Sequence, residues 1–209
     1  MSPSGAGDQA GRWAAVLLAG GQARRLGGAD KPGIGIGGRT LAAMVVDAAT
    51  QAGARHVVVV GPRRPELITE QATVEFTSEA PPGSGPVPAL RAGLDLVAEP
   101  WLMLLAGDMP FLRERHLRAI LAAARQAGGA MLVDDGGRPQ WLASCWRSAD
   151  LRGALTGYRG DSLRGLLEPL HGIGVPISAE AGQPAPWLDC DTPADLAVAR
   201  DWARRTRTS

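Results

Sequence analysis

Three short apolar runs constrain the fold of this chain more than any other feature of its sequence. They lie at residues 14–18 (AAVLL), 56–60 (HVVVV) and 101–106 (WLMLLA). None of them alternates apolar with polar residues, so each is expected to form a strand that is buried on both faces. Segments with helical character lie between them. The pattern therefore predicts an α/β fold, with a Rossmann-like, mostly parallel sheet and helices on both faces, in three layers α/β/α.

The other expected elements follow from capping and turn residues. Thr40 is expected to cap a helix over 41–52, with Gly53 at its C-terminal end. We also expect a strand at 73–76, helices over 89–98 and 113–126, a strand at 130–133 that turns through Asp134-Asp135-Gly136-Gly137 into 140–146, two short helical stretches, and a final helix from about Pro193 to Arg204.

Length and composition bound the class of protein. A chain of 209 residues suits one large domain, which we place at 13–205 after a small polar leader at 1–12 that is expected to be disordered. Apolar residues make up 45% and charged residues 21%, which excludes a disordered chain. The net charge of +1 predicts neither a nucleic-acid nor a membrane partner. No apolar run reaches the roughly 18 residues of a membrane span and no signal-peptide core is present, so a cytoplasmic protein is expected.

Cysteine and histidine are sparse and scattered. Cys145 and Cys190 are far apart in sequence and belong to no CxxC pair, so neither a zinc site nor a disulfide framework is expected. Both are interpreted as small buried apolar residues. His56, His116 and His171 are interpreted as packing or surface residues.

Unusual chemistry follows all three apolar runs, and the second run ends in the turn Gly61-Pro62. In open parallel sheets, ligands bind beyond the carboxyl ends of the strands. A Gly-rich loop with Arg24, Arg25 and Lys31 follows the first run, and glycines let backbone N–H groups approach a phosphate chain whose charge the cations offset. The spacing matches neither GxGxxG nor a P-loop. Asp108 follows the third run, in the turn Gly107-Asp108-Met109-Pro110.

Lys31 is also singled out by composition. It is the only lysine among 22 basic residues. A lysine in a chain that otherwise uses arginine either survives by chance or is needed as a compact ammonium where a planar guanidinium would not serve.

The loop carries a resemblance to a known family. The string LAGGQARRLGGADK at 18–31 resembles the LAGGxxxRMGGxDK signature of molybdenum cofactor guanylyltransferases, nucleotidyltransferases of the sugar-nucleotide pyrophosphorylase type. Only Leu26 departs, where Met is usual. Three further segments resemble the family in the same order: GPVPAL at 85–90 resembles GPLAGL, GDMPF at 107–111 resembles CDMPF, and DCDTPADL at 189–196 resembles NxNTPEDL. The four motifs span nearly the whole chain.

The resemblance implies a nucleotide-diphospho-sugar transferase-like fold and a Mg²⁺-dependent transfer of GMP from GTP to molybdopterin, with release of pyrophosphate. A molybdoenzyme or another protein of cofactor biosynthesis is the implied recipient. The implied catalytic residues are Arg25, Lys31 and Asp108. The implied metal ligands are Asp108 and Asp191, and Mg²⁺ typically takes one or two carboxylates together with substrate phosphates. The alternative for Asp108 is a simple strand-terminating turn residue. The implied nucleotide contacts are Leu18, Ala19, Gly20, Gly21, Lys31, Glu79, Gly85, Pro86 and Asp108.

Several details of the resemblance stay open at this point. Glu79 falls near a family Asp, and a slip of one residue would put Ser78 there instead. Val60 replaces an Asn that some relatives place near the base, so that contact is lost or made by the backbone of Gly61. Asp189 and Asp191 stand where relatives often have Asn. They either contact the metal or the pterin, or Asp191 caps the last helix, with Pro193 at its start.

Two further points have alternatives: how the acceptor is bound, and which nucleotide base is recognised. Segments 140–142 and 160–164 lie in the half that binds the acceptor in relatives, where Arg159 or Arg164 either pairs with a phosphate or is an exposed surface residue. The main alternative function is a cytidylyltransferase, or an NTP transferase for another phosphorylated acceptor, and a non-catalytic nucleotide or cofactor carrier is a further one. Gly20-Gly21 and Gly85-Pro86 favour guanine, because small residues leave room for a purine.

Overall fold

The computed structural model describes residues 11–20 and 30–207, so residues 1–10 of the leader expected at 1–12 lie outside that part. A seven-stranded sheet with the order β5-β4-β1-β6-β8-β7-β9 forms its centre. The strands are β1 (Trp13–Leu18), β4 (His56–Val60), β5 (Thr73–Thr77), β6 (Trp101–Ala106), β7 (Gly129–Val133), β8 (Pro139–Arg147) and β9 (Ile173–Pro176). All neighbouring strands run parallel except β8, which is antiparallel to β6 and β7. The predicted mostly parallel sheet is confirmed.

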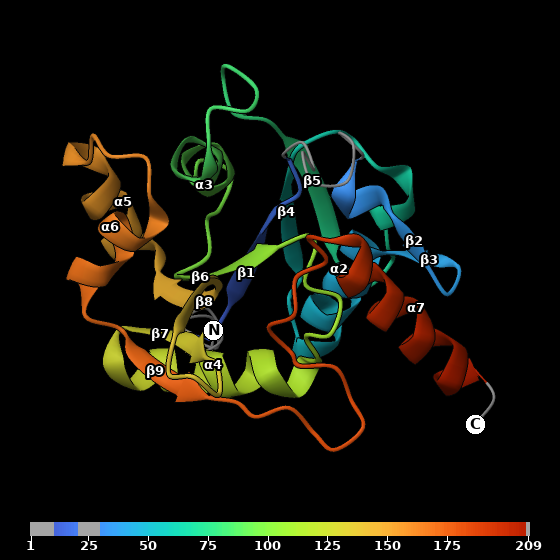
Figure 1. Ribbon diagram of the computed structural model, residues 1–209. Helices are drawn as coiled ribbons and strands as arrows, with labels where there is room; N and C mark the ends of the chain where they lie inside the picture. The colour runs from blue at the N-terminus through green and yellow to red at the C-terminus, as the bar shows by residue number, and fades with distance from the viewer. Residues whose placement is uncertain (1–10, 21–29, 208–209) are drawn as a thin grey trace, which may run out of the picture.

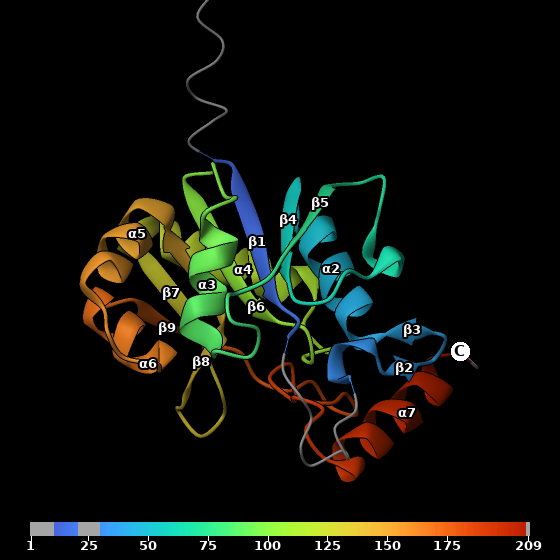
Figure 2. The same ribbon diagram turned by 90° about the horizontal axis from the view of Figure 1, so that it is seen from above.

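Helices cover both faces of this sheet, as predicted (Figures 1 and 2). On one face lie α2 (Leu41–Ala52) and α4 (Glu114–Ala127), and on the other lie α3 (Pro86–Leu94), α5 (Ser148–Gly157) and α6 (Leu163–Leu167). The central strand β1 serves both cores: Ala15 and Leu17 pack toward α2 and α4, while Ala14 and Val16 pack toward α3. All four side chains are almost fully buried, which is why the run shows no alternation of polar residues.

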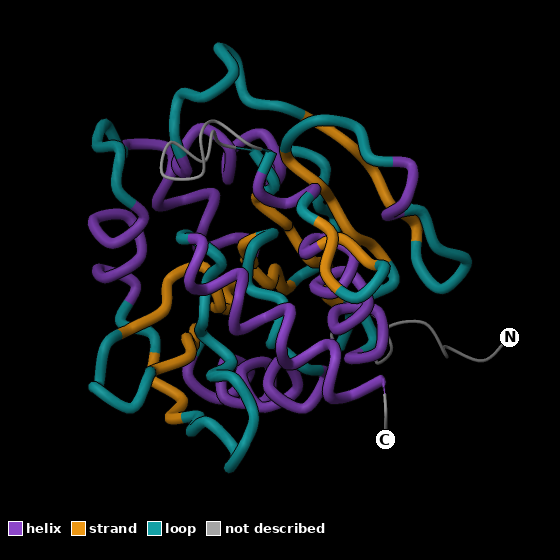
Figure 3. The backbone as a smooth tube through the Cα atoms, turned by 45° about the vertical axis from the view of Figure 1, so that its right-hand side comes forward, coloured by secondary structure: helices purple, strands orange, loops and turns teal. Residues whose placement is uncertain are grey.

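A third, smaller cluster lies outside the three layers. It joins α7 (Pro193–Arg207), which crosses the front of the molecule in Figure 3, to the antiparallel pair β2 (Gly35–Ile36) and β3 (Arg39–Thr40). Phe111, just after β6, packs edge-on against Trp202 of α7 with ring centroids 5.4 Å apart. This packing holds the C-terminal half of α7, where Trp202 lies, against the segment that follows β6.

The predicted caps of α2 and the predicted β7–β8 turn are confirmed in atomic detail. The Oγ1 atom of Thr40 accepts a hydrogen bond from the backbone N–H of Ala43, and Gly53 ends α2 in the left-handed region at φ 109°. In the β7–β8 hairpin, Asp134 Oδ1 accepts from the N–H groups of Gly136 and Arg138, both at 2.9 Å.

Some boundaries were wrong. The helix expected over 89–98 spans 86–94 instead, because Pro86 sits at the first helical position, where a missing N–H costs nothing. Strand β9 was missed, since Gly174 and Pro176 disfavour a strand and most of its residues are exposed at the sheet edge. The β2–β3 pair and the 3₁₀ turns η2 (Lys31–Gly33), η3 (Pro65–Leu67) and η4 (Glu168–Leu170) were not predicted either.

Across residues 11–20 and 30–207, no helix combines the length and the apolar character that crossing a bilayer requires.

Candidate active site

The carboxyl ends of β1, β4 and β6 meet at one edge of the sheet. Beyond the strand ends, the N–H of Ala19 donates to Val60 O at 2.8 Å, and the N–H of Gly107 donates to Leu18 O at 3.0 Å. Gly61 has a φ of 148°, and a Cβ there would lie 2.7 Å from the carbonyl of Ala19. Only glycine fits this position, which is what lets the loop after β1 turn across β4.

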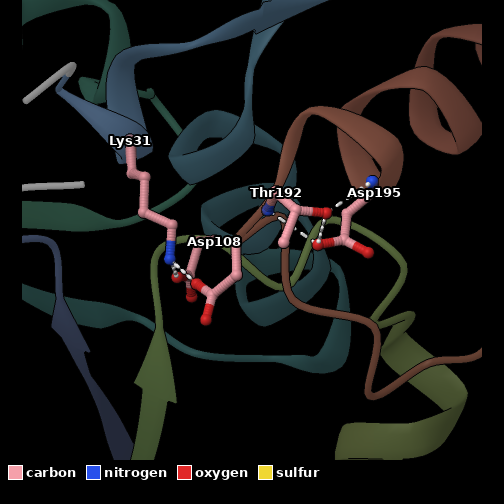
Figure 4. A network of polar contacts seen from close by, with 5 residues as sticks. Lys31, Asp108, Thr192 and Asp195 are labelled. Carbon is pink, nitrogen blue, oxygen red and sulfur yellow. Dashed lines mark hydrogen bonds and ion pairs between the residues drawn. The ribbon is translucent and has the colours of Figure 1, made fainter. Parts of the chain in front are cut away.

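An ionic cluster of three side chains lies at this edge (Figure 4). Lys31, at the start of η2, donates from Nζ to Asp108 Oδ2 at 2.8 Å and also contacts Asp191 Oδ1. Asp108 follows β6 and Asp191 precedes α7, so the chain brings together groups that are 77 and 160 residues apart. The two carboxylates outnumber the one ammonium. The cluster therefore carries a net charge of −1 when all three groups are ionised.

Contacts between the segments that carry the three side chains hold these segments close together. The N–H of Cys190 donates to Asp108 O at 3.1 Å, which ties the segment before α7 to the end of β6. The turn η2 packs close to the same point, since a Cβ at Gly107 would lie 3.3 Å from Cβ of Pro32. These two contacts bring the sequence-predicted residues Lys31, Asp108 and Asp191 together.

Asp191 does not cap α7. Thr192 does: its Oγ1 accepts from the N–H of Asp195 at 3.2 Å, and Asp195 Oδ2 accepts from the N–H of Thr192 at 2.7 Å (Figure 4). This reciprocal pair satisfies the N–H groups of Thr192 and Asp195 at the start of the helix, and Pro193 follows as predicted. With the capping role filled, Asp191 is free to face Lys31.

Two cavities meet at Asp108. The smaller, of about 240 Å³, lies beside the loop after β1, and the larger, of about 560 Å³, lies beside β8 and α6. Pro86, Ala106, Asp108 and Leu142 line both of them. The smaller is also lined by Leu18, Gly20, Val60, Glu79, Gly83, Gly85 and Ala89. The larger is also lined by Met109, Pro139, Gln140, Trp141, Asp161, Ser162, Leu163, Arg164, Trp187 and Asp189.

The structure gathers most of the sequence-predicted nucleotide contacts around the smaller cavity. Glu79 is buried there, and its Oε1 accepts from the N–H of Gly83 at 2.8 Å. Ala19 is buried and does not line the cavity. Gly21 and Arg25 lie outside the described residues. The N–H of Gly61 donates to Thr77 O at 2.8 Å, so the backbone donor that was considered for a base contact is already used.

The larger cavity contains residues that the sequence did not single out. Trp187 lines it from the irregular segment before α7, and no sequence signal marks that tryptophan. Trp141 was noted only as part of the segment 140–142. Arg164 lines the cavity as well, but its guanidinium is exposed and bonds to Glu168 at 3.2 and 3.3 Å. Asp189 faces the cavity, and burial together with the charge of Asp108 raises its pKa.

The family model described as the MobA-like NTP transferase domain matches residues 15–173. The chain belongs to this family.

One sequence relative supports this assignment, and two solved structures share the fold. A molybdenum cofactor guanylyltransferase of Rhodopseudomonas palustris is 32% identical over 203 residues, covering 91% of this chain and 92% of the relative. A nucleotidyl transferase from Methanothermobacter shares the fold with a TM-score of 0.73 at 21% identity, covering 93% of this chain and 99% of its own. Molybdopterin-guanine dinucleotide biosynthesis protein A from Archaeoglobus fulgidus gives a TM-score of 0.68 at 20% identity, covering 92% and 99%.

The two cysteines of this NTP transferase are unreactive as nucleophiles. Cys145 and Cys190 are both buried and unbridged, as predicted. Burial raises the pKa of each thiol to about 12, with the charge of Asp108 adding to the effect at Cys190. Both therefore stay protonated at neutral pH and supply no thiolate nucleophile.

The histidines lie in structural positions. His116 is buried in the first turn of α4, where its Nδ1 accepts from the N–H of Arg113 at 3.2 Å. Burial, aided by Arg115 and Arg113, lowers the pKa of His116 to about 4, so its ring is neutral. His56 pairs with Glu99 at 3.2 Å at the amino end of β4, and His171 is exposed in the turn after η4.

Proposed function

We propose that this protein transfers GMP from GTP to molybdopterin, releasing pyrophosphate and forming a guanine dinucleotide cofactor. One observation carries the proposal: Asp108 lines both cavities, and therefore stands where two substrates would meet. The family membership and the name of the R. palustris relative, which matches along nearly its whole length, support guanylyl transfer as the reaction.

The smaller cavity is assigned to GTP. Gly20, Gly83 and Gly85 line it without side chains, so a purine and its ribose can approach the backbone closely. Leu18, Ala19, Gly21 and Pro86 complete the assigned contacts, and Glu79 offers a buried carboxylate to the N–H or O–H donors of the nucleoside. We assign Lys31, together with Arg25 in the loop outside the described residues, to the triphosphate, since cations offset its charge.

The carboxylates of the ionic cluster fit a magnesium ion. Across residues 11–20 and 30–207, no three acidic, histidine or cysteine side chains form a complete metal cage. Mg²⁺ does not need one, because it takes one or two carboxylates together with waters and substrate phosphates. We propose Asp108 and Asp191 as its ligands, where their net charge of −1 with Lys31 favours a cation. When bound, the ion would neutralise charge on the phosphates of GTP.

The larger cavity is assigned to the acceptor. Its walls present the indole rings of Trp141 and Trp187 together with the polar groups of Gln140 and Asp189, which suits a flat, polar heterocycle. An oxygen of the acceptor's terminal phosphate would attack the α-phosphorus of GTP, and pyrophosphate would leave on the opposite side. The protein contributes chiefly by holding the two substrates in line at Asp108 and by balancing their charge.

The remaining parts of the proposal concern the molecule as a whole. We infer that residues 13–205 act as one nucleotidyltransferase domain in the cytoplasm. The product would pass to a molybdoenzyme or to another protein of cofactor biosynthesis.

The test is direct. The purified protein is incubated with molybdopterin, Mg²⁺ and GTP labelled at the α-phosphorus, and the label is followed into the dinucleotide while pyrophosphate is measured. We expect both products in equal amounts with GTP. Equal or faster transfer from CTP would replace the proposal with a cytidylyltransferase, and binding of GTP without any release of pyrophosphate would replace it with a carrier.

A further inference from the structure

Arg64 lies in the loop between β4 and η3. Arginine is seldom buried, because its guanidinium loses strong hydration. Arg64 is only 6% exposed, and it is the one buried arginine in the part of the chain whose burial is described. Its neighbour Arg63 is exposed and lies 5.7 Å over the ring of Phe76. The burial of Arg64 therefore does not come from the loop as a whole.

The partner of Arg64 is Asp30. Nη2 of Arg64 forms an ion pair with Oδ1 of Asp30, whose side chain is itself 56% exposed. The Nε atom of Arg64 has no hydrogen-bond partner among the described residues, so the guanidinium is buried without full satisfaction. An ion pair with one buried partner is weak evidence for stability, since the desolvation of Arg64 offsets much of its Coulomb energy. The Arg64–Asp30 pair is better explained as holding the neighbouring turn in position than as stabilising the fold.

The pair closes over the turn that carries Lys31. Asp30 immediately precedes η2, and its side chain makes no cap to the turn because it reaches Arg64 instead. A Cβ at Gly33 would lie 2.5 Å from Asp30 Oδ2 and 2.6 Å from Arg64 Nη1. The absence of a side chain at Gly33 is thus what lets the ion pair lie across η2.

The other end of the turn is held separately. The N–H of Leu41 donates to Ile34 O at 3.0 Å, which fastens the exit of η2 to the start of α2. The Arg64–Asp30 pair fastens its entry. Between these two points Lys31 extends its side chain, 16% exposed, to Asp108 and Asp191.

We propose that Arg64 is a positioning residue, which holds the η2 turn through Asp30 so that the ammonium of Lys31 faces Asp108 and Asp191. Its importance for turnover rests on the proposed function, but its effect on the placement of Lys31 does not. Arg64 acts through Lys31 and has no contact with substrate in this scheme.

The single lysine makes the placement measurable without substrates. An amine-acylating reagent can modify only Lys31 and the terminal α-amino group, and peptide mass spectrometry separates the two sites. We expect Lys31 to be acylated several-fold faster in Arg64→Met and in Asp30→Asn than in the unaltered protein, because the ammonium is released from its two carboxylates. The α-amino group serves as the internal reference, and Arg63→Met is the matched control, expected to label like the unaltered chain.

Turnover gives a second readout. If Lys31 is misplaced by an ångström, kcat for transfer should fall by about 100-fold in Arg64→Met. The double variant Arg64→Met/Lys31→Ala should then be no slower than Lys31→Ala alone, since Arg64 would have nothing left to position.

Two results would overturn the inference. One is an unchanged rate of Lys31 acylation in both Arg64→Met and Asp30→Asn, with circular dichroism showing that both variants are folded. The other is a double variant whose losses multiply, which would give Arg64 a role independent of Lys31. If the unaltered protein transfers no GMP but the acylation rates differ as expected, the proposed function fails and the positioning role stands.

Discussion

Replacing Asp108 by Asn separates the chemistry of this site from its stability. Asn has nearly the same shape and keeps the backbone carbonyl that accepts from Cys190, but it removes one negative charge from the point where the two cavities meet. Turnover and folding should therefore respond very differently.

The expected cost in stability is small. The Lys31–Asp108 pair has a distance of 2.8 Å and side chains that are 16% and 20% exposed, so water screens it in part. Lys31 keeps its contact with Asp191, and the change also removes repulsion between Asp108 and the nearby carboxylate of Asp189. We expect the free energy of unfolding to change by no more than about 1 kcal/mol.

The expected cost in turnover is large. Removing one preorganised electrostatic group from a phosphoryl-transfer site costs about 10²–10³ in kcat, or about 3–4 kcal/mol in transition-state stabilisation. Asp108 is also the proposed ligand of Mg²⁺, so the loss should lie at the upper end of that range. The activation free energy should then rise by several times the change in unfolding free energy.

Two assays measure the two quantities on the same preparation. Steady-state GMP transfer gives kcat and KM, and urea denaturation gives the free energy of unfolding. Asp47→Asn is the matched control, since Asp47 is ion-paired to Arg39 on the exposed surface of α2, away from the cavities. The reasoning is refuted if folded Asp108→Asn turns over at the unaltered rate, or if its loss of activity merely follows an equal loss of stability.

Three further predictions concern single positions. Lys31→Arg should lower kcat or raise the KM for GTP despite keeping the charge, because a planar guanidinium does not replace a compact ammonium between two carboxylates; wild-type values for both would make the lysine incidental. The pKa of His116 is about 4 in the folded protein against 6.5 in the unfolded chain, so the unfolded chain binds an extra proton between these pH values. The free energy of unfolding should therefore fall by about 3 kcal/mol as the pH drops from 6.5 to 4. Urea titrations of His116→Gln should lack this part of the pH dependence. Gly93→Ala should destabilise the fold by about 1–3 kcal/mol in urea, because its Cβ would lie 2.5 Å from Val16 Cγ1 and 2.9 Å from Val60 Cγ2 inside the core; a more stable variant would contradict this packing argument.

The sequence predicted the parts of this protein that depend on local chemistry. The unbroken apolar run of β6 was assigned to the residues that the structure shows, and Thr40 and Gly53 bound α2 as expected. These features follow from neighbouring residues alone, through burial pattern and backbone preference. The start of α3 was predicted wrongly because the local sequence is ambiguous there. A proline such as Pro86 is compatible either with a loop or with the first position of a helix.

The sequence predicted which residues belong to the candidate site, but not how they are arranged. The motifs indicated Lys31, Asp108 and Asp191 one by one, yet the contacts between them cross 77 and 160 residues and exist only because β6, η2 and the start of α7 pack together. The same holds for Trp187 and Arg64, which carry no local signal. Local patterns determine which elements form, since each residue's own neighbours decide its backbone. Only packing of the whole chain decides which side chains face one another, because that choice depends on surfaces that do not exist until the elements are assembled.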